Sequence, residues 1–93
     1  MAIQSFRCKD TRALFERRRV RRFAAVEAVA RRKLELLHAA VGLDFLRVPP
    51  GNRLEALSGK RKGQYSIRVN DQFRVCFVWT ADGPAQVEIV DYH

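Results

Sequence analysis

In the first half of the chain, hydrophobic residues recur at intervals of three and four, the spacing that places side chains on one face of a helix. The residues of this stripe are Phe23, Val26, Ala30, Leu34, Leu37 and Val41. Gly42 follows them and is a suitable residue to end the helix. The same spacing turns Arg31, Arg32 and Lys33 mostly outward.

Two shorter segments precede this helix. Residues 3–6 are apolar and short, as in an edge strand. A helix is expected over about residues 11–17, because the side chains of Asp10 and Thr11 can cap free backbone amides at its start.

The second half of the chain changes to a period of two, the period of strands. Apolar and polar residues alternate over residues 64–69, 73–79 and 87–90, and turn residues at 70–71 and 81–84 separate these stretches. The pattern predicts an antiparallel meander of two or three pairings. Helices first and a meander last predict an α+β domain, with the N-terminal helices packed on the apolar face of a twisted antiparallel sheet and the other face left polar.

The length and composition favour one small globular domain spanning residues 1–93. The content of hydrophobic residues, 47%, is too high for a disordered chain of this charge. The sequence contains neither the apolar run of a signal peptide nor a stretch of about 20 apolar residues that could span a bilayer, so we expect a cytoplasmic protein. Cys8 and Cys76 lack the paired spacing of a zinc site, and no motif implies a metal or a cofactor.

Positive charge is concentrated in the first third of the chain. The 18 Lys and Arg residues exceed the 10 Asp and Glu residues and give a net charge of +8, all of which falls within residues 1–33. Nucleic-acid phosphate is the commonest partner for such a cluster. An anionic membrane face, an acidic protein or a solvated arm without a ligand are the other interpretations. The candidate RNA-binding residues of this third are Arg18, Arg19, Arg21, Arg22, Arg31 and Arg32.

Further basic groups and several acid/base groups belong to the polar face of the predicted sheet and to its last strand. They are Glu55, Lys60, Arg61, Lys62, Arg68, Arg74, Asp91, Tyr92 and His93. Of these, Lys60, Arg61, Lys62 and Arg68 are candidate RNA-binding residues. Cleavage of RNA without a metal needs a base for the 2′-hydroxyl proton, an acid for the leaving 5′-oxygen, and cations that stabilise the charge on the phosphorus. These residue types are suitable, but the polar face of a half-buried sheet carries similar residues by default.

Three segments carry a resemblance to a known family: residues 52–59, residues 63–74 and residues 87–93. Together they resemble the RelE/ParE superfamily of toxins, and specifically its HigB branch, over nearly the whole chain. The resemblance implies a microbial RNase fold and ribosome-dependent cleavage of mRNA in the decoding site, which inhibits translation and growth. It also implies neutralisation by a HigA-type antitoxin with a helix-turn-helix domain, in a complex expected to be a heterotetramer.

The resemblance also implies roles for individual residues. Asp91, Tyr92 and His93 match the C-terminal catalytic cluster of the family, and Arg74 matches the strand arginine that contacts the scissile phosphate. We expect Arg74 to stabilise charge, His93 to transfer a proton with Asp91 orienting it, and Tyr92 to stack on or position the RNA. The basic turn near the family's site is matched by Lys60, Arg61 and Lys62.

One position departs from the family pattern. Many HigB toxins have a histidine just before the basic turn, where this chain has Glu55. A carboxylate at this position is either an auxiliary base or a structural acceptor for an arginine. Two other functions remain open: a ParE-like gyrase poison that cleaves no RNA, and a non-catalytic basic RNA-binding module.

Overall fold

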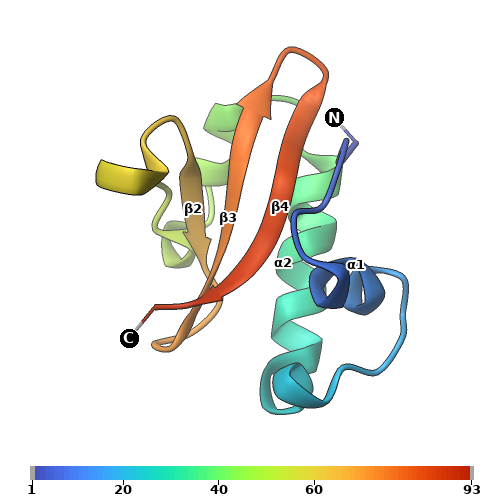
Figure 1. The fold of residues 1–93 in the computed structure, drawn as a ribbon. Coiled ribbons are helices and arrows are strands. Elements are labelled where there is room, and N and C mark those ends of the chain that lie inside the picture. The colour runs from blue at the N-terminus through green and yellow to red at the C-terminus, as the bar shows by residue number, and fades with distance from the viewer. Residues whose placement is uncertain (1, 93) are drawn as a thin grey trace.

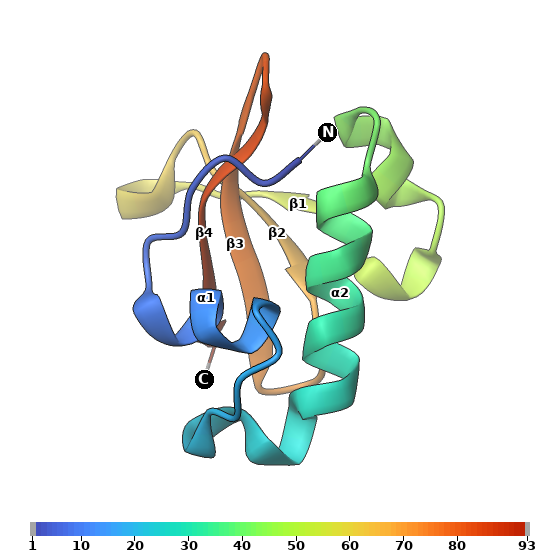
Figure 2. The same cartoon turned by 90° about the vertical axis from the view of Figure 1, so that its right-hand side faces the viewer.

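The computed structural model describes residues 2–92 and folds them into helices packed on one four-stranded antiparallel sheet. The helices are α1 (Lys9–Phe15), η1 (Arg21–Val26), α2 (Glu27–Ala39), η2 (Leu43–Arg47), η3 (Pro50–Asn52) and η4 (Gly59–Arg61), the η elements being 3-10 helices. The strands are β1 (Glu55–Ala56), β2 (Tyr65–Arg68), β3 (Phe73–Thr80) and β4 (Gly83–Asp91), paired in that order. Figure 1 and Figure 2 show α1 and α2 on the same side of this sheet. The predicted α+β fold is confirmed.

The core lies between α2 and the side of the sheet that faces it. Ala30, Leu34 and Leu37 are fully buried because they fall on one stripe of α2. The sheet supplies Ile67, Val75, Phe77, Val87 and Ile89. Each large apolar side chain removed from water in this way contributes roughly 1.5–3 kcal/mol to stability.

The predicted stripe continues too far at its C-terminal end. Val41 is 78% exposed, so its assignment to the buried stripe is wrong. The reason is that α2 ends at Ala39 and Ala40 adopts an extended conformation, with φ −61° and ψ 130°. Val41 therefore no longer follows the helical spacing, although it is hydrophobic like the residues of the stripe.

The segment before α1 runs along β4 without forming a regular strand. The backbone N–H of Gln4 donates to the carbonyl of Pro84 at 2.7 Å, and that of Arg7 donates to the carbonyl of Val87 at 3.0 Å. Phe6 and Val87 form an isolated parallel bridge. The predicted edge strand is thus reduced to a short edge contact.

The start of α1 also differs from the prediction. The helix begins at Lys9, and Cys8 occupies the N-cap position without a side-chain hydrogen bond, so the predicted capping by Asp10 and Thr11 is wrong. Thr11 is instead fully buried, and its hydroxyl accepts a hydrogen bond from the backbone N–H of Ile89 at 3.0 Å. A residue expected to cap a helix therefore ties α1 to β4.

Arg31 is directed inward, contrary to the outward orientation that its spacing predicted. Its guanidinium donates to the backbone carbonyls of Leu14 at 3.0 Å and Arg18 at 2.9 Å, and to the carboxylate of Glu27 at 2.7 Å. These contacts fasten α2 to the end of α1, and only 17% of the Arg31 side chain is exposed. Backbone carbonyls at the C-terminal end of a helix need donors, and Arg31 donates to one in the last turn of α1 and to one after it.

No helix within residues 2–92 is long and apolar enough to cross a membrane.

Candidate active site

The face of the sheet turned away from α2 brings polar side chains from all four strands into rows. The strand register aligns Glu55 with Ser66, Ser66 with Cys76, and Cys76 with Glu88. Side chains directly opposite one another in a sheet share a face, so these four residues form one row. Arg68, Arg74 and Val90 form the next row. The predicted polar face is present, but its centre is buried: Ser66 and Cys76 are fully inaccessible.

Arg74 is the most firmly held cation of this face. Its Nε donates to the hydroxyl of Ser66 at 2.7 Å, and its NH2 group donates to the backbone carbonyl of Arg53 at 2.6 Å. The carboxylate of Glu55 lies 3.6 Å from the same NH2 group. Only 10% of the Arg74 side chain is exposed. A guanidinium fixed by three partners meets an oxyanion without first having to be ordered.

The Arg53 carbonyl, which accepts a hydrogen bond from Arg74, lies next to a residue with several contacts of its own. Arg53 has a left-handed backbone conformation, with φ 45°, directly after η3. Asn52, in η3, is fully buried; its side-chain amide donates to the carbonyl of Leu46 at 3.2 Å and accepts a hydrogen bond from the ammonium of Lys33. Burial lowers the pKa of Lys33, and the positive charges of Arg32 and Arg68 lower it further. A partly buried hydrogen bond therefore links α2 to Asn52, next to the Arg53 turn.

Tyr92 completes the exposed side of this group. The centre of its ring lies 5.9 Å from the guanidinium carbon of Arg74, within the range of a cation–π contact. Its backbone N–H donates to the carbonyl of Gln72 at 2.6 Å, which fixes the strand end, while 43% of the residue stays exposed. Arg74, Glu55 and Tyr92 are thus brought together, as a common site requires.

Asp91 is placed differently. It is the strand partner of Phe73, whereas its neighbour Val90 is the partner of Arg74, so Asp91 lies on the face opposite to Arg74. Its carboxylate accepts a hydrogen bond from the side-chain amide of Gln72 at 3.0 Å. The predicted His93 lies outside the described residues, so the predicted contact between Asp91 and His93 stays a prediction.

The basic turn before β2 contributes one ordered cation. Arg61 donates to the carboxylate of Glu88 at 2.9 Å and to the side chain of Gln64 at 3.1 Å. The hydrogen bond to Glu88 raises the pKa of Arg61. Lys60 and Lys62 are exposed. The turn therefore places Arg61 against the sheet and its two lysines in solvent.

Two further residues of this face have contacts of their own. Cys76 is buried beside the Arg61–Glu88 pair, and this burial raises the pKa of its thiol. Arg68, at the end of β2, forms an ion pair with Asp71 in the following turn.

The sequence did not single out several residues that build the site. Ser66 and Asn52 are neutral, and both act through partners that belong to other helices or strands. Strand alternation assigned Ser66 and Glu88 to polar positions of their strands. Only the register shows that they flank Cys76 in one row.

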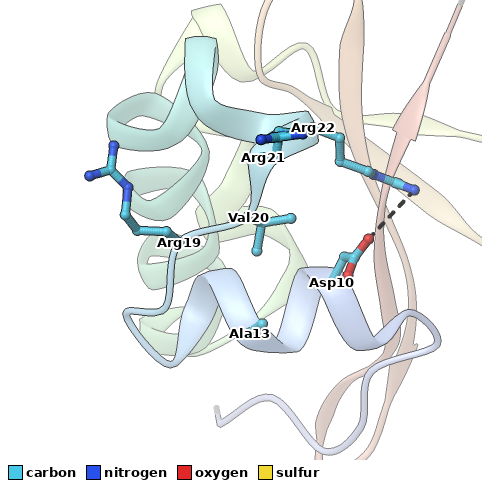
Figure 3. Close-up of a pocket in the computed structure, with 6 residues that line it drawn as sticks. All are labelled: Asp10, Ala13, Arg19, Val20, Arg21 and Arg22. Atoms are coloured by element: carbon cyan, nitrogen blue, oxygen red, sulfur yellow. Dashed lines mark ion pairs between the residues drawn. The ribbon is translucent and has the colours of Figure 1, made fainter.

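The exposed arginines of the N-terminal third lie on the helical side of the molecule. Arg22 is 3.8 Å from the carboxylate of Asp10, and its guanidinium lies 4.6 Å from the ring centre of Phe23. Arg18 forms an ion pair with Glu16. Among residues 2–92, no carboxylate lies within ion-pair distance of Arg19 or Arg21, which surround a hollow beside α1, as Figure 3 shows. Arg32 is exposed on α2.

Across the described range, 2–92, no group of three or more His, Cys, Asp or Glu side chains converges as a metal ion requires.

A family model and one of the similar proteins point to the same family. The matching family model, described as the RelE-like toxin of the type II toxin-antitoxin system HigB, covers residues 4–93. Toxin HigB-1 of Vibrio cholerae serotype O1 is 49% identical over 70 residues, which are 75% of this chain and 73% of that protein. An uncharacterized protein of Haemophilus influenzae is 45% identical over 49 residues, 53% of this chain and 48% of that protein. The resemblance in the three sequence segments is confirmed, and the chain belongs to the RelE-like HigB toxins of type II toxin-antitoxin systems.

Proposed function

We propose that this toxin is a metal-independent endoribonuclease that cleaves mRNA on the ribosome and thereby inhibits translation and growth. The observation that carries the proposal is Arg74, a nearly buried guanidinium held by Ser66 and by the carbonyl of Arg53 at the centre of the open sheet face. A cation fixed at one place is what a transition state with charge on phosphorus requires. Membership in the HigB family supports the same activity.

In the proposed reaction the 2′-hydroxyl of one nucleotide loses its proton to a base and attacks the adjacent phosphorus. The bond from phosphorus to the 5′-oxygen breaks, a 2′,3′-cyclic phosphate forms, and an acid returns a proton to the leaving oxygen. Arg74 stabilises the phosphoryl oxygens, and the half-exposed carboxylate of Glu55, beside Arg74, is the base candidate.

The C-terminal residues supply the remaining roles. Tyr92 positions a base or the ribose by stacking, since its ring is exposed beside Arg74. His93 is the proton donor, and Asp91 orients it. Arg61, ordered by Glu88, and the exposed Lys60 and Lys62 attract the RNA backbone.

The basic surface supports docking among the phosphates of ribosomal RNA. Arg18, Arg19, Arg21, Arg22 and Arg32 are exposed and are the proposed contacts of the helical side. Arg31 was a candidate too, but its guanidinium already serves three protein partners, so its contribution is to hold the surface together.

A toxin of a toxin-antitoxin system has an antitoxin partner. We propose that this partner is a HigA-type protein with a helix-turn-helix domain, that two toxins and two antitoxins form a heterotetramer, and that the pair acts in the cytoplasm.

The direct test is toeprinting of mRNA on programmed ribosomes, with the wild-type protein beside His93→Ala. The proposal predicts cuts in the decoding site that disappear with the variant. Growth inhibition without any cut would favour a protein target such as gyrase. Growth inhibition that survives removal of the last three residues, with RNA still bound and uncut, would favour a non-catalytic binding module.

A further inference from the structure

The surface beside η1 carries three hollows that share lining residues and together form a depression. Arg19, Val20 and Arg21 line both the first and the second hollow, and Arg22 lines both the first and the third. The third hollow ends at Gln72, Phe73 and Asp91. We call this depression the η1 groove. In Figure 1 and Figure 2, η1, the β2–β3 turn and the C-terminal end of β4 lie at the same end of the molecule.

The η1 groove leads to the catalytic face proposed above. Its last lining residue, Asp91, is followed by Tyr92, whose ring lies beside Arg74 on the other face of the sheet. A flexible polymer that passes round the end of β4 can therefore touch Arg74 and lie in the η1 groove at the same time. A rigid duplex cannot follow this bend as readily as a single strand.

The lining suits a single-stranded nucleic acid. Arg19 and Arg21 are exposed beside the half-buried Ala13 and the buried Val20, and the view in Figure 3 shows their guanidinium groups on different sides of Val20. An apolar floor flanked by planar cations offers both stacking for bases and charge for phosphates. Asp10 lines the same hollow, but its carboxylate is paired with Arg22 at 3.8 Å.

We propose that the η1 groove binds the single-stranded messenger RNA itself, at nucleotides beyond the scissile phosphate, through Arg19 and Arg21. This inference rests on the proposed nuclease function and assigns these arginines to the substrate strand. General attraction to ribosomal RNA would use any exposed arginine, whereas a substrate groove uses those that line it.

The test is the dependence of binding on RNA length, measured with the full chain and 2′-O-methyl RNA, which lacks the nucleophilic hydroxyl and cannot be cut. Fluorescence anisotropy compares oligonucleotides of about 4 and about 12 nucleotides, the range of single-strand binding sites. The matched variants are Arg19→Ala/Arg21→Ala and Arg32→Ala/Arg47→Ala. Each double variant removes two exposed positive charges, but only the first removes them from the groove.

The wild type should bind the long RNA about tenfold more tightly than the short RNA, because stacking and phosphate contacts add along the strand. Arg19→Ala/Arg21→Ala should abolish this difference and reduce the slope of log K against log salt by about 1.4, for two lost phosphate contacts. Arg32→Ala/Arg47→Ala should weaken both RNAs equally and keep the difference.

Equal behaviour of the two double variants would overturn the proposal in favour of diffuse attraction. Normal length dependence in Arg19→Ala/Arg21→Ala, with binding to the purified antitoxin lost, would overturn it in favour of a protein interface. The uncut RNA keeps this test separate from the nuclease assay. A wild type that cuts no mRNA would refute the proposed function without changing the binding result.

Discussion

Two groups of arginines give this toxin its positive charge, and they are held in opposite ways. Arg74 and Arg31 are largely buried, and each has several partners from other segments of the chain. Arg19 and Arg21 are exposed, with no carboxylate within ion-pair distance in the described part of the chain. Residue type is the same in both groups, but the surroundings differ.

The buried and the exposed surroundings suit two different functions of the arginine side chain. A guanidinium that is already positioned stabilises a transition state with little reorganisation, or replaces a missing backbone donor. An exposed guanidinium attracts phosphate over a distance, and this attraction is screened by salt. We therefore expect substitutions in the first group to change rates or stability, and substitutions in the second group to change affinity.

The largest effect is expected at Arg74. Arg74→Lys keeps the charge but loses the hydrogen bonds of the planar guanidinium to Ser66 and Arg53, so cleavage on the ribosome should slow by about 10²–10³-fold. Single-turnover cleavage of mRNA measures this loss. The control is Arg68→Lys. Arg68 is the strand partner of Arg74 and is paired with the exposed Asp71, so this substitution should change the rate less than about threefold. Equal losses in both variants would show that the several partners of Arg74 give it no special role in cleavage.

The next effect concerns stability and separates Arg31 from Arg32. Arg31→Ala removes the donor to the carbonyl of Arg18 and one of the two donors to the carbonyl of Leu14, which should lower the free energy of unfolding by about 1–3 kcal/mol. Arg32→Ala on the same helix should change it by less than about 0.5 kcal/mol. Urea denaturation followed by circular dichroism compares the two variants. If Arg31→Ala left the free energy of unfolding unchanged, Arg31 would belong with the exposed arginines.

A smaller effect tests how Arg74 is positioned. Ser66→Ala removes the acceptor of its Nε–H, and the maximal cleavage rate should fall by about tenfold, equivalent to about 1.4 kcal/mol. Ser66→Thr, which keeps the hydroxyl, should restore part of the rate. The exposed Ser58→Ala is the control. If Ser66→Ala raised only the RNA concentration needed for half-maximal rate, Ser66 would act in binding and not in positioning.

The smallest expected effect concerns the thiol of Cys76, which is buried in the same face of the sheet. The pKa of Cys76 is raised by burial, so between its unfolded and folded values the folded protein keeps a proton that the unfolded chain has lost. The resulting contribution to stability is present below the unfolded pKa and disappears as the pH rises through the folded pKa. Stability should therefore decline at alkaline pH, and Cys76→Ala should flatten this decline.

Reaction with a thiol reagent is a second test of the burial of Cys76. The half-buried Cys8 should react before the inaccessible Cys76. Rapid modification of both thiols in the native protein would show that the Arg61–Glu88 side of the sheet opens readily.

The sequence predicted the order of helices and strands because the hydrophobic period changes from helical to alternating near the middle of the chain. It also selected Arg74, Glu55 and Tyr92 as site candidates, and the fold brings these three side chains together. Thr11 and Arg31 were predicted incorrectly, since their contacts with Ile89 and Leu14 join segments that local spacing does not relate.

The placement of Asp91 depends on strand register, which the alternation of residues alone does not fix. Ser66 and Asn52 gave no signal of their own, because a neutral residue reveals a supporting role only through its partners. The roles of Asp91 and His93 stay predictions that the nuclease assay tests.

The most direct test is the cleavage rate on programmed ribosomes as a function of toxin concentration, for the wild type, Arg74→Lys and Arg19→Ala/Arg21→Ala. For Arg74→Lys we expect a maximal rate reduced by at least about 10²-fold. For the double variant we expect an unchanged maximal rate, with about tenfold more toxin needed to reach half of it. The reverse pattern, a normal maximal rate for Arg74→Lys and a collapsed one for the double variant, would contradict the assignment of chemistry to the sheet face and of binding to the η1 groove.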